Sequence, residues 1–447
     1  MVRTIGHFFP HLNDWIDDIP DPRFLPFVVY HKRFLFWWGL SLFLFKLGSR
    51  RQLDYELDAR GTQVLDNFNR LAGTQQQTRP VNKTLNYFLG RIGPQPVADV
   101  LRRMVRRLLR MKVLDRARLQ GQWVVAIDGT GYLLFRERHC QHCLEWHCGD
   151  NTFYLHQVLE AKLLGPEGLV VSLGTVFIDN SDVADTLAGS KAEERKQDCE
   201  LKAFNRLDAQ LKDTFPKLPI CYSGDSLFAC GRSLQLAQDS GRGYVFVLKP
   251  GRLPTVWQDF QSLLPLCPQQ QLERVTPAGV RQVYQWVHDL SYTDDQKRTW
   301  TFTAIQCQET VDEQTTTWAW ITNRKVTVQT VIDVATKGGR HRWHLENQGF
   351  NTQKNSGFNL EHVYSHHSWQ AFYYLLQIAH LILQLLEKGS LLRCLAQELG
   401  QTPMQLFGSL KNIARRLLDS IRYLRIDDAA YDPAAAARIQ IRLDNSS

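Results

Sequence analysis

The membrane-like stretch of the 447-residue sequence is too short to cross a membrane as a helix. This stretch is the twelve residues FLFWWGLSLFLF, from Phe34 to Phe45, whereas about 20 residues are needed to span roughly 30 Å of hydrocarbon. The N-terminus also lacks the charged segment and short apolar run of a secretory signal peptide. We therefore expect Phe34–Phe45 to be a buried or interface helix, the protein to be cytoplasmic, and no membrane to be a partner. Membrane association through this stretch is the alternative.

The nine cysteines do not form the even set that a disulfide framework needs, and an odd number in a large chain fits reduced thiols in a cytosol. There is no second CxxC motif at zinc-finger distance. A zinc deaminase is excluded, because no proline precedes Cys140 and no His-x-Glu lies upstream in the right context. No internal repeat is present either.

Six of the cysteines and histidines are concentrated in the segment RHCQHCLEWHCGD: His139, Cys140, His142, Cys143, His147 and Cys148. Cys140 and Cys143 form the CxxC half of a tetrahedral zinc site, and thiolates with imidazoles suit zinc. The fourth ligand would be Cys148, His147 or His156. Two interpretations stay open: a structural Zn²⁺ site, or a thiol-rich hairpin without metal.

Acidic residues are outnumbered, 45 to 53, by lysine and arginine, which gives a formal net charge of +8 and a pI near 9.0. This balance suits a nucleic-acid partner. Eight basic residues fall within seventeen positions, from Arg102 to Arg118, on a predicted amphipathic helix whose other face is apolar. We expect this helix to contact DNA phosphates through Arg103, Arg106 and Arg107. A solvated basic face is the alternative.

Three widely separated acids have the residue type and setting of a two-metal site. Asp128 in WVVAIDGTG and Asp225 in LPICYSGDSLFA each close a short apolar run that predicts a buried strand. Glu346 lies in GRHRWHLENQGFNTQKN, on a predicted helix among basic and polar residues. Carboxylate oxygens bind Mg²⁺, and two such cations can activate a water and stabilise the leaving oxygen of a phosphodiester. Taken singly, each aspartate is also explained as a turn residue or a helix N-cap.

The segment around Glu346 resembles the glutamate motif of DDE transposases from bacterial insertion sequences. In that superfamily an arginine precedes the glutamate by four residues, as Arg342 does here. A lysine usually follows by seven residues; here Gln353 holds that position and Lys354 comes one later, still near the glutamate's face of a helix. The resemblance to one branch of these transposases extends, in the expected order, over AIDGT, KQDCELKAFNRL, GDSLFA, RHRWHLENQGFN and YYLLQIAHLI.

This resemblance implies an RNase H-like core that cleaves and transfers DNA strands at the ends of an insertion sequence. It implies two Mg²⁺ or Mn²⁺ ions held by Asp128, Asp225 and Glu346. Arg342 and Lys354 would contact phosphates near the scissile bond, with Arg340 as a further contact. The implied partners are double-stranded DNA with terminal inverted repeats and a target DNA. Joining two ends favours a homodimer on DNA, and the setting would be the bacterial cytoplasm, at the nucleoid.

Hydrophobic periodicity predicts an α/β fold in five segments. Residues 1–118 form a helical DNA-binding region, and residues 119–251 form the first part of the core, with three strands, a helix, a strand, a helix and a strand. Residues 252–325 are rich in strand patterns. The spacing of 121 residues from Asp225 to Glu346 is too long for the plain core, so we interpret this segment as a β-rich insertion. Two roles are open for this insertion: it would hold the DNA end, or it would serve as a structural lid. Residues 326–390 return to the core with Glu346 and an apolar helix that packs on the sheet, and 391–447 form a helical region with a loose tail.

Two other functions fit the same residues. An RNase H-like nuclease that cuts without joining would use the same metal chemistry. A transposase-derived protein that binds DNA without catalysis is the non-enzymatic alternative, and the presence of all three acids argues against it.

Overall fold

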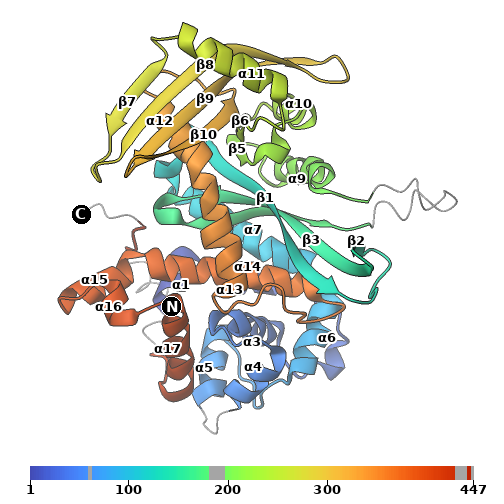
Figure 1. The fold of residues 1–447 in the computed structure, drawn as a ribbon. Helices are drawn as coiled ribbons and strands as arrows, with labels where there is room; N and C mark the ends of the chain where they lie inside the picture. Colours follow the sequence, from blue (N-terminus) through green and yellow to red (C-terminus); the bar gives the residue numbers. More distant parts are fainter. Residues whose placement is uncertain (59–62, 181–196, 428–439, 444–447) are drawn as a thin grey trace, which may run out of the picture. The chain divides into compact units, whose positions relative to one another are not determined.

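The computed structural model describes residues 1–58, 63–180, 197–427 and 440–443. The chain folds into two compact units (Figure 1). One comprises Arg116–Asn347, and the other combines Met1–Asp115 with Gln348–Ser447. The residues from Gln348 onward therefore join the N-terminal helices in one unit, whereas the sequence alone predicts that residues 326–390 belong to the catalytic core.

The unit Arg116–Asn347 is built on a mixed sheet, which has ten strands in the part of the chain that is described. Its strand order is β2-β3-β1-β5-β6-β10-β9-β8-β7, and β4 also pairs with β3. β5 and β6 run parallel to β1, and all other pairs are antiparallel. The strands are β1 Trp123–Phe135, β2 Leu144–Cys148, β3 Asn151–Leu164, β4 Val170–Ile178, β5 Ile220–Gly224, β6 Gly243–Val247, β7 Gln271–Val275, β8 Arg281–Thr293, β9 Thr299–Val311 and β10 Gln314–Thr322.

The predicted α/β class and the predicted order of core elements are confirmed. Three long strands, helix α9 (Glu200–Thr214), β5, helix α10 (Gly231–Asp239) and β6 follow one another. The run WVVAI is apolar and rich in β-branched residues, and ICYSG opens with Ile, Cys and Tyr; both form strands that lie buried at the sheet centre. Two details differ. β2 is an additional strand, and β1 does not end at Asp128 but continues to Phe135, because its later residues pair with β3 past a bulge between Gly131 and Leu133.

The β-rich segment continues the same sheet. β10 pairs antiparallel with β6, and β9, β8 and β7 follow outward. The prediction of strands here is confirmed, and the segment is an extension of the sheet through main-chain hydrogen bonds. Helix α11 (Pro254–Leu263) packs against β8. Short 3₁₀ turns complete the unit: η2 Asp115–Ala117, η3 Pro166–Gly168, η5 Ser226–Phe228 and η6 Leu264–Leu266.

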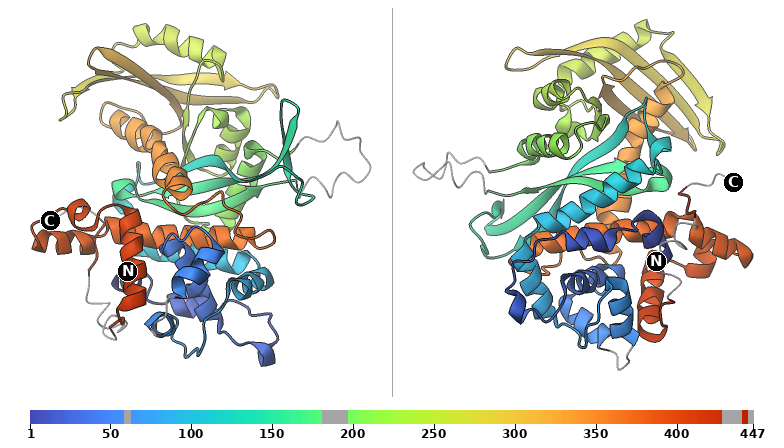
Figure 2. Two further views of the ribbon diagram at one scale, coloured as in Figure 1. Left: turned by 60° about the horizontal axis from the view of Figure 1, so that its bottom comes forward. Right: turned by 180° about the vertical axis from the view of Figure 1, so that it is seen from behind.

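Helices cover both faces of the central strands (Figures 1 and 2). α9 lies on the face of Tyr222, whose hydroxyl donates to Asp208 on that helix. Ser223, the next residue of β5, points to the opposite face. There its hydroxyl donates a hydrogen bond to the carbonyl of Gly338, which belongs to an irregular helical segment that begins at Val331. That segment consists of α12 Val331–Asp333, a π-helical turn η7 Val334–Gly339, a 3₁₀ turn η8 Arg340–Arg342 and a second π-helical turn η9 Leu345–Asn351.

The second unit is helical in its described residues. α14 is its buried central helix and packs against α3 and α7. α14, which the sequence alone predicts to pack on the sheet, belongs to this unit. The helices are α1 Val2–Phe8, α2 Leu12–Asp17, η1 Leu25–Phe27, α3 Lys32–Leu44, α4 Arg50–Leu57, α5 Gln63–Ala72, α6 Asn82–Ile92, α7 Gln95–Arg110, α13 Thr352–Asn355, α14 Trp369–Lys388, α15 Ser390–Glu398, α16 Pro403–Phe407 and α17 Leu410–Tyr423.

Both apolar helices are core helices of this unit. In α3 every residue from Phe34 to Leu44 is buried, which confirms the buried-helix interpretation of the Phe34–Phe45 stretch. Among the described residues, one segment, Trp369–Glu398, is long and apolar enough to cross a membrane by length and composition, and 78% of its most apolar window is buried inside the protein. Such burial is that of a core helix.

The C-terminal end of the chain adds detail to the predicted helical region with a loose tail. Its helices α16 and α17 are separate, because Gly408 adopts a φ of +70° that a helix cannot accommodate. The predicted loose tail lies mainly in residues 428–439 and 444–447, outside the described residues, as do residues 193–196 of the predicted helix before β5.

The irregular helical segment packs closely against the sheet at Gly339, and this close packing can be tested. A Cβ atom at Gly339 would lie 2.5 Å from Cε2 of Trp320 on β10. Gly339→Ala should therefore destabilise the protein by about 1–3 kcal/mol through overpacking. Gly251→Ala is the matched control, because a Cβ there meets nothing within 4 Å. Equal thermal midpoints for the two variants would contradict this close packing.

Candidate functional site

Asp128 lies in the middle of β1, where a central strand holds its side chain firmly. Its register partner on β3 is Glu160. One carboxylate oxygen accepts a hydrogen bond from the backbone N–H of Gly129 at 3.0 Å, and the other lies 3.3 Å from Nη1 of Arg342. The side chain is 19% exposed, so it reaches solvent from a partly desolvated position.

Asp225 follows β5, the parallel neighbour of β1. Its Oδ1 accepts a hydrogen bond from the backbone N–H of Leu227 at 2.9 Å, so it caps the short turn η5. The interpretation as a capping residue is thus confirmed. Capping engages one carboxylate oxygen and does not exclude a second role, because a carboxylate has two oxygens and about four acceptor sites.

Glu346 and Arg342 lie one turn apart on the segment that covers the Ser223 face of the sheet. Glu346 stands in the π-helical turn η9, a geometry that occurs frequently at functional sites. Nη1 of Arg342 is 2.6 Å from Oε1 of Glu346, and the same nitrogen reaches Asp128. Arg342 is only 10% exposed, and Glu346 is 38% exposed. The guanidinium thus bridges two acids that are 218 residues apart in the sequence.

The electrostatics join Asp225 to this pair. Burial raises the pKa of Asp128 from 3.8 to about 7. The positive charge of Arg342 opposes this shift, while the negative charges of Glu346, Glu200 and Asp225 add to it. The three predicted acids therefore lie close enough to interact within one unit of the structure. A carboxyl with such a strongly perturbed pKa is a functional-site candidate.

Glu200 is a fourth acid of the site that the sequence-based reasoning did not single out. It is the first residue of α9, and its carboxylate lies over Gly129: a Cβ there would be 2.2 Å from Oε1 of Glu200. Burial raises the pKa of Glu200, and the charge of Asp225 raises it further. In the sequence, Glu200 could be noticed only through its position in KQDCELKAFNRL. An acid in the first turn of a helix is commonly explained by its favourable interaction with the helix dipole, so this position does not by itself indicate a site.

The donor set fits hard divalent cations. Four carboxylates from β1, α9, the end of β5 and η9 supply oxygens, the ligands that Mg²⁺ and Mn²⁺ prefer. Their mutual repulsion, recorded in the raised pKa of Asp128, is relieved by positive charge. In this structure Arg342 supplies that charge to Asp128 and Glu346. Any cation held here would be bound by Asp128, Asp225 and Glu346, with Glu200 beside them.

The other predicted phosphate contacts are bound to protein groups. Arg340 makes two hydrogen bonds to Glu309 on β9, at 2.6 and 3.3 Å, and its guanidinium stacks on Trp318 at 4.4 Å. These contacts favour a role in fastening the helical segment to the sheet. Lys354 belongs to the helical unit and pairs with Glu361 at 2.7 Å.

Gln353 shows why a lysine is not at the motif's usual position. Its side chain is fully buried in the helical unit. It donates to Gln377 at 2.8 Å and contacts Nδ1 of His380 at 2.9 Å. A lysine in this place would bury an unpaired ammonium, which is costly.

The basic helix predicted to contact DNA is α7. Its apolar face is buried, as predicted, and its arginines lie on the other side. Arg103 is ion-paired with Asp18, and Arg102 with Asp99. Arg106 is exposed and Arg107 is partly exposed. Part of the positive charge of this face is therefore neutralised by neighbouring acids.

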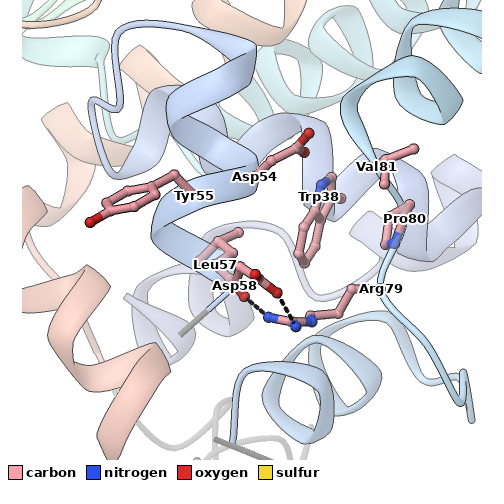
Figure 3. Close-up of a pocket in the computed structure, with 8 residues that line it drawn as sticks. All are labelled: Trp38, Asp54, Tyr55, Leu57, Asp58, Arg79, Pro80 and Val81. Carbon is pink, nitrogen blue, oxygen red and sulfur yellow. Dashed lines mark hydrogen bonds and ion pairs between the residues drawn. The ribbon is translucent and has the colours of Figure 1, made fainter. Parts of the chain in front are cut away.

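A surface hollow in the helical unit is not suited to phosphate. It is lined by Trp38, Asp54, Tyr55, Leu57, Asp58, Arg79, Pro80 and Val81 (Figure 3). Its arginine, Arg79, is bound to Asp58 and to the carbonyl of Leu57. With two carboxylates on its wall and its cation engaged, the hollow lacks the free positive charge that a DNA backbone requires.

The thiol-rich segment forms a group of its own between β1 and β3. His139, Cys140, Cys143 and His156 bring their ligand atoms within 4.8 Å of one another. Of the fourth ligands predicted, His156 belongs to this group. His147 and Cys148 lie outside it on β2, where both side chains are exposed.

Comparison of the sequence with protein-family models found no match, and comparison with curated proteins found none either. The assignment of function therefore rests on the residues, their geometry and their resemblance to a known motif.

The raised pKa of Asp128 predicts a pH-dependent stability effect. The folded protein retains a proton at Asp128 up to about pH 7, whereas the unfolded chain releases it near pH 3.8. Ionisation therefore destabilises the fold progressively as the pH rises between these values. With a chelator present, Asp128→Asn should raise the free energy of unfolding at pH 8 by an amount on the order of 1–3 kcal/mol, seen as a higher thermal midpoint, and the gain should shrink toward pH 4.

Asp259→Asn is the control for this measurement, because Asp259 is exposed on α11. The effect should be seen in thermal unfolding at pH 4, 6 and 8. A destabilised Asp128→Asn variant at pH 8 would mean that Asp128 is a structural acid.

Proposed function

We propose that the protein is a metal-dependent DNA strand transferase of the DDE transposase type with an RNase H-like core. The observation that carries this proposal is the meeting of Asp128, Asp225 and Glu346 in one unit, with Arg342 bridging the first and last. The motif around Glu346 supplies the class of reaction. The three acids are far apart in the sequence, and a shared site explains why each stands where it does.

The architecture supports the proposal. The strands β4, β3 and β1 are antiparallel neighbours, and β5 and β6 continue from β1 in parallel. α9 and α10 stand before and after β5. This arrangement agrees with the element order that the resemblance implies. It brings Asp128 and the residue after β5 to adjacent strands, and adjacent strands lie about 4.8 Å apart.

The chemistry follows from the residues. When bound, a pair of Mg²⁺ or Mn²⁺ ions activates a water or a DNA 3′-hydroxyl and stabilises the departing oxygen of a phosphodiester. Asp128, Asp225 and Glu346 would hold the ions. Because no side chain needs to form a covalent link to DNA, cleavage and joining use one set of residues.

Arg342 has a second task in this scheme. A guanidinium has five donors, and the contacts to Asp128 and Glu346 both use Nη1. Its remaining donors can bind a phosphate oxygen beside the carboxylates. Arg342 would thus orient the scissile phosphate, and Lys354, in the helical unit, would contact a DNA phosphate.

The partners follow from the reaction. We infer double-stranded DNA with terminal inverted repeats as the donor and a second DNA as the target. Two ends must be joined in one complex, so a homodimer on DNA is the expected assembly. Such an enzyme would act at the nucleoid in a bacterial cytoplasm. The extension β7–β10 is the expected support for the DNA end.

Substitution of the acids tests the proposal. Asp128→Asn, Asp225→Asn and Glu346→Gln should each lower Mg²⁺-dependent cleavage by about 10³-fold or more, because loss of one ligand misplaces the ions. The substrate is a labelled fragment carrying the DNA that flanks the coding region. Binding of this fragment in the presence of Ca²⁺ should stay within a factor of about three. Asp259→Asn and Glu313→Gln, both exposed, serve as controls.

The outcomes distinguish the alternatives. Cleavage at the wild-type rate in the triple variant would overturn the assignment. Cleavage without any joined product from paired ends would identify a nuclease. Specific DNA binding by the wild-type protein, without cleavage in Mg²⁺ or Mn²⁺, would identify a transposase-derived binding protein.

DNA binding by α7 is a separate prediction. Changing Arg103, Arg106 and Arg107 together to Ala should weaken binding of the end fragment and flatten the dependence of log affinity on log salt by up to about 2–3 slope units, because fewer counterions are released. Changing Lys212 and Lys217, which lie at the end of α9 and after it, is the control. An unchanged slope in the arginine variant, measured by fluorescence anisotropy from 50 to 200 mM salt, would place the DNA surface elsewhere.

A further inference from the structure

A second cluster of ligating side chains lies in the sheet unit, apart from the acids. Cys140, Cys143 and His139 belong to the connection between β1 and β2, and His156 belongs to β3. Their four ligand atoms lie within 4.8 Å of one another. Two cysteines and two histidines form one of the usual ligand sets of structural zinc sites.

The distances within the cluster match those that a tetrahedral ion imposes. Zn–S bonds of about 2.3 Å and Zn–N bonds of about 2.0–2.1 Å place two sulfurs about 3.8 Å apart and a sulfur and a nitrogen about 3.5 Å apart. The Sγ atoms of Cys140 and Cys143 are 3.5 Å apart. Nε2 of His156 lies 3.4 Å from the Cys140 sulfur and 3.6 Å from the Cys143 sulfur. Three atoms thus stand at the separations that one shared ion requires.

Neighbouring groups hold the ligands in place. Cys143 and His156 are buried, at 0% and 1% exposure. Burial raises the pKa of the Cys140 thiol, and the backbone N–H groups of His142 and Cys143 beside its sulfur oppose that shift. The loop itself is fastened by Asn180, after β4, whose side-chain amide donates to the carbonyl of Cys143 at 3.0 Å.

The histidine rings are also positioned by contacts. The ring of His139 meets that of Phe135, at the end of β1, edge-on at 4.2 Å between centroids. The rings of His139 and His156 are 5.1 Å apart. Such packing fixes ring orientation before an ion arrives, as supporting contacts do around metal ligands.

We propose that His139, Cys140, Cys143 and His156 bind one structural Zn²⁺ ion. The set is closed, with four protein ligands, which is typical of a structural rather than a catalytic zinc site. The ion would tie the β1–β2 connection to β3 and keep β2 on the edge of the sheet. This inference is independent of the proposed DNA chemistry, because it uses none of the four acids.

Metal analysis of the full-length protein tests the inference. Protein purified rapidly under reducing conditions should contain about one zinc per chain by elemental analysis. Cys140→Ser combined with Cys143→Ser should abolish zinc, and His156→Asn alone should weaken retention against a chelator by at least about 10-fold. Cys148→Ser and His147→Asn should keep it in full, because these side chains lie outside the group.

Folding is monitored separately, so that loss of zinc is not confused with loss of structure. Zinc removal from the wild-type protein by a chelator should lower its thermal midpoint, and added Zn²⁺ should restore it, whereas the double serine variant should respond to neither. Replacement by Co²⁺ should give the visible absorption of a tetrahedral thiolate site.

Three results would overturn the inference. One is the absence of stoichiometric metal in fresh, reduced protein that also takes up no added Zn²⁺. The second is another metal bound in place of zinc. The third is loss of zinc in Cys148→Ser or His147→Asn while the Cys140/Cys143 variant retains it.

Discussion

The contact of Arg342 with both Asp128 and Glu346 is the interaction on which the site depends. Its 3.3 Å contact with Asp128 joins a central strand to the segment on the Ser223 face of the sheet, and its 2.6 Å contact with Glu346 lies within that segment. Four carboxylates gather in a partly desolvated place, and their repulsion would oppose folding without a cation. The surrounding structure holds the arginine in position. Gly338 and Gly339 allow the segment to approach β6 and β10 closely, and Arg340 fastens it to Glu309. The energetic strain of the acids is thus offset by packing away from them.

The sequence predicts the framework well because its signals are strong and local. WVVAI is apolar and largely β-branched, and ICYSG begins with three residues that suit a buried strand, so both patterns predict strands. Other features depend on pairing that a single sequence does not encode. β1 passes through Asp128 because β3 pairs with it on both sides of that residue. The β-rich segment joins the main sheet through the β6–β10 pairing. α14 resembles a helix that covers a sheet, but it forms the centre of the helical unit.

The site was predictable only where a motif marked it. Asp128, Asp225, Glu346 and Arg342 stand in recognisable segments. Glu200 does not, because a glutamate at the start of a helix has an ordinary explanation. Its position beside Gly129 is visible only in the structure. In the thiol-rich segment the CxxC motif identified half of the cluster. The choice among His147, Cys148 and His156 required the register of β3, which places His156 opposite Leu133. The two clusters differ in their ligand atoms and in their position. The acids offer oxygens, and the other cluster offers sulfur and imidazole nitrogen. On β3, His156 is four residues, or about 13 Å, from Glu160, the register partner of Asp128.

The most direct measurement is strand cleavage and joining by the wild-type protein. Purified protein is incubated with a supercoiled target plasmid and labelled DNA that carries both flanks of the coding region. In Mg²⁺ or Mn²⁺ the account predicts cuts at the element boundaries and a labelled product joined to the plasmid. With a chelator, neither should form. Equal cleavage with and without divalent cations, or no interaction with this DNA at all, would contradict the claim that the acids around Arg342 form a metal-dependent DNA-processing site.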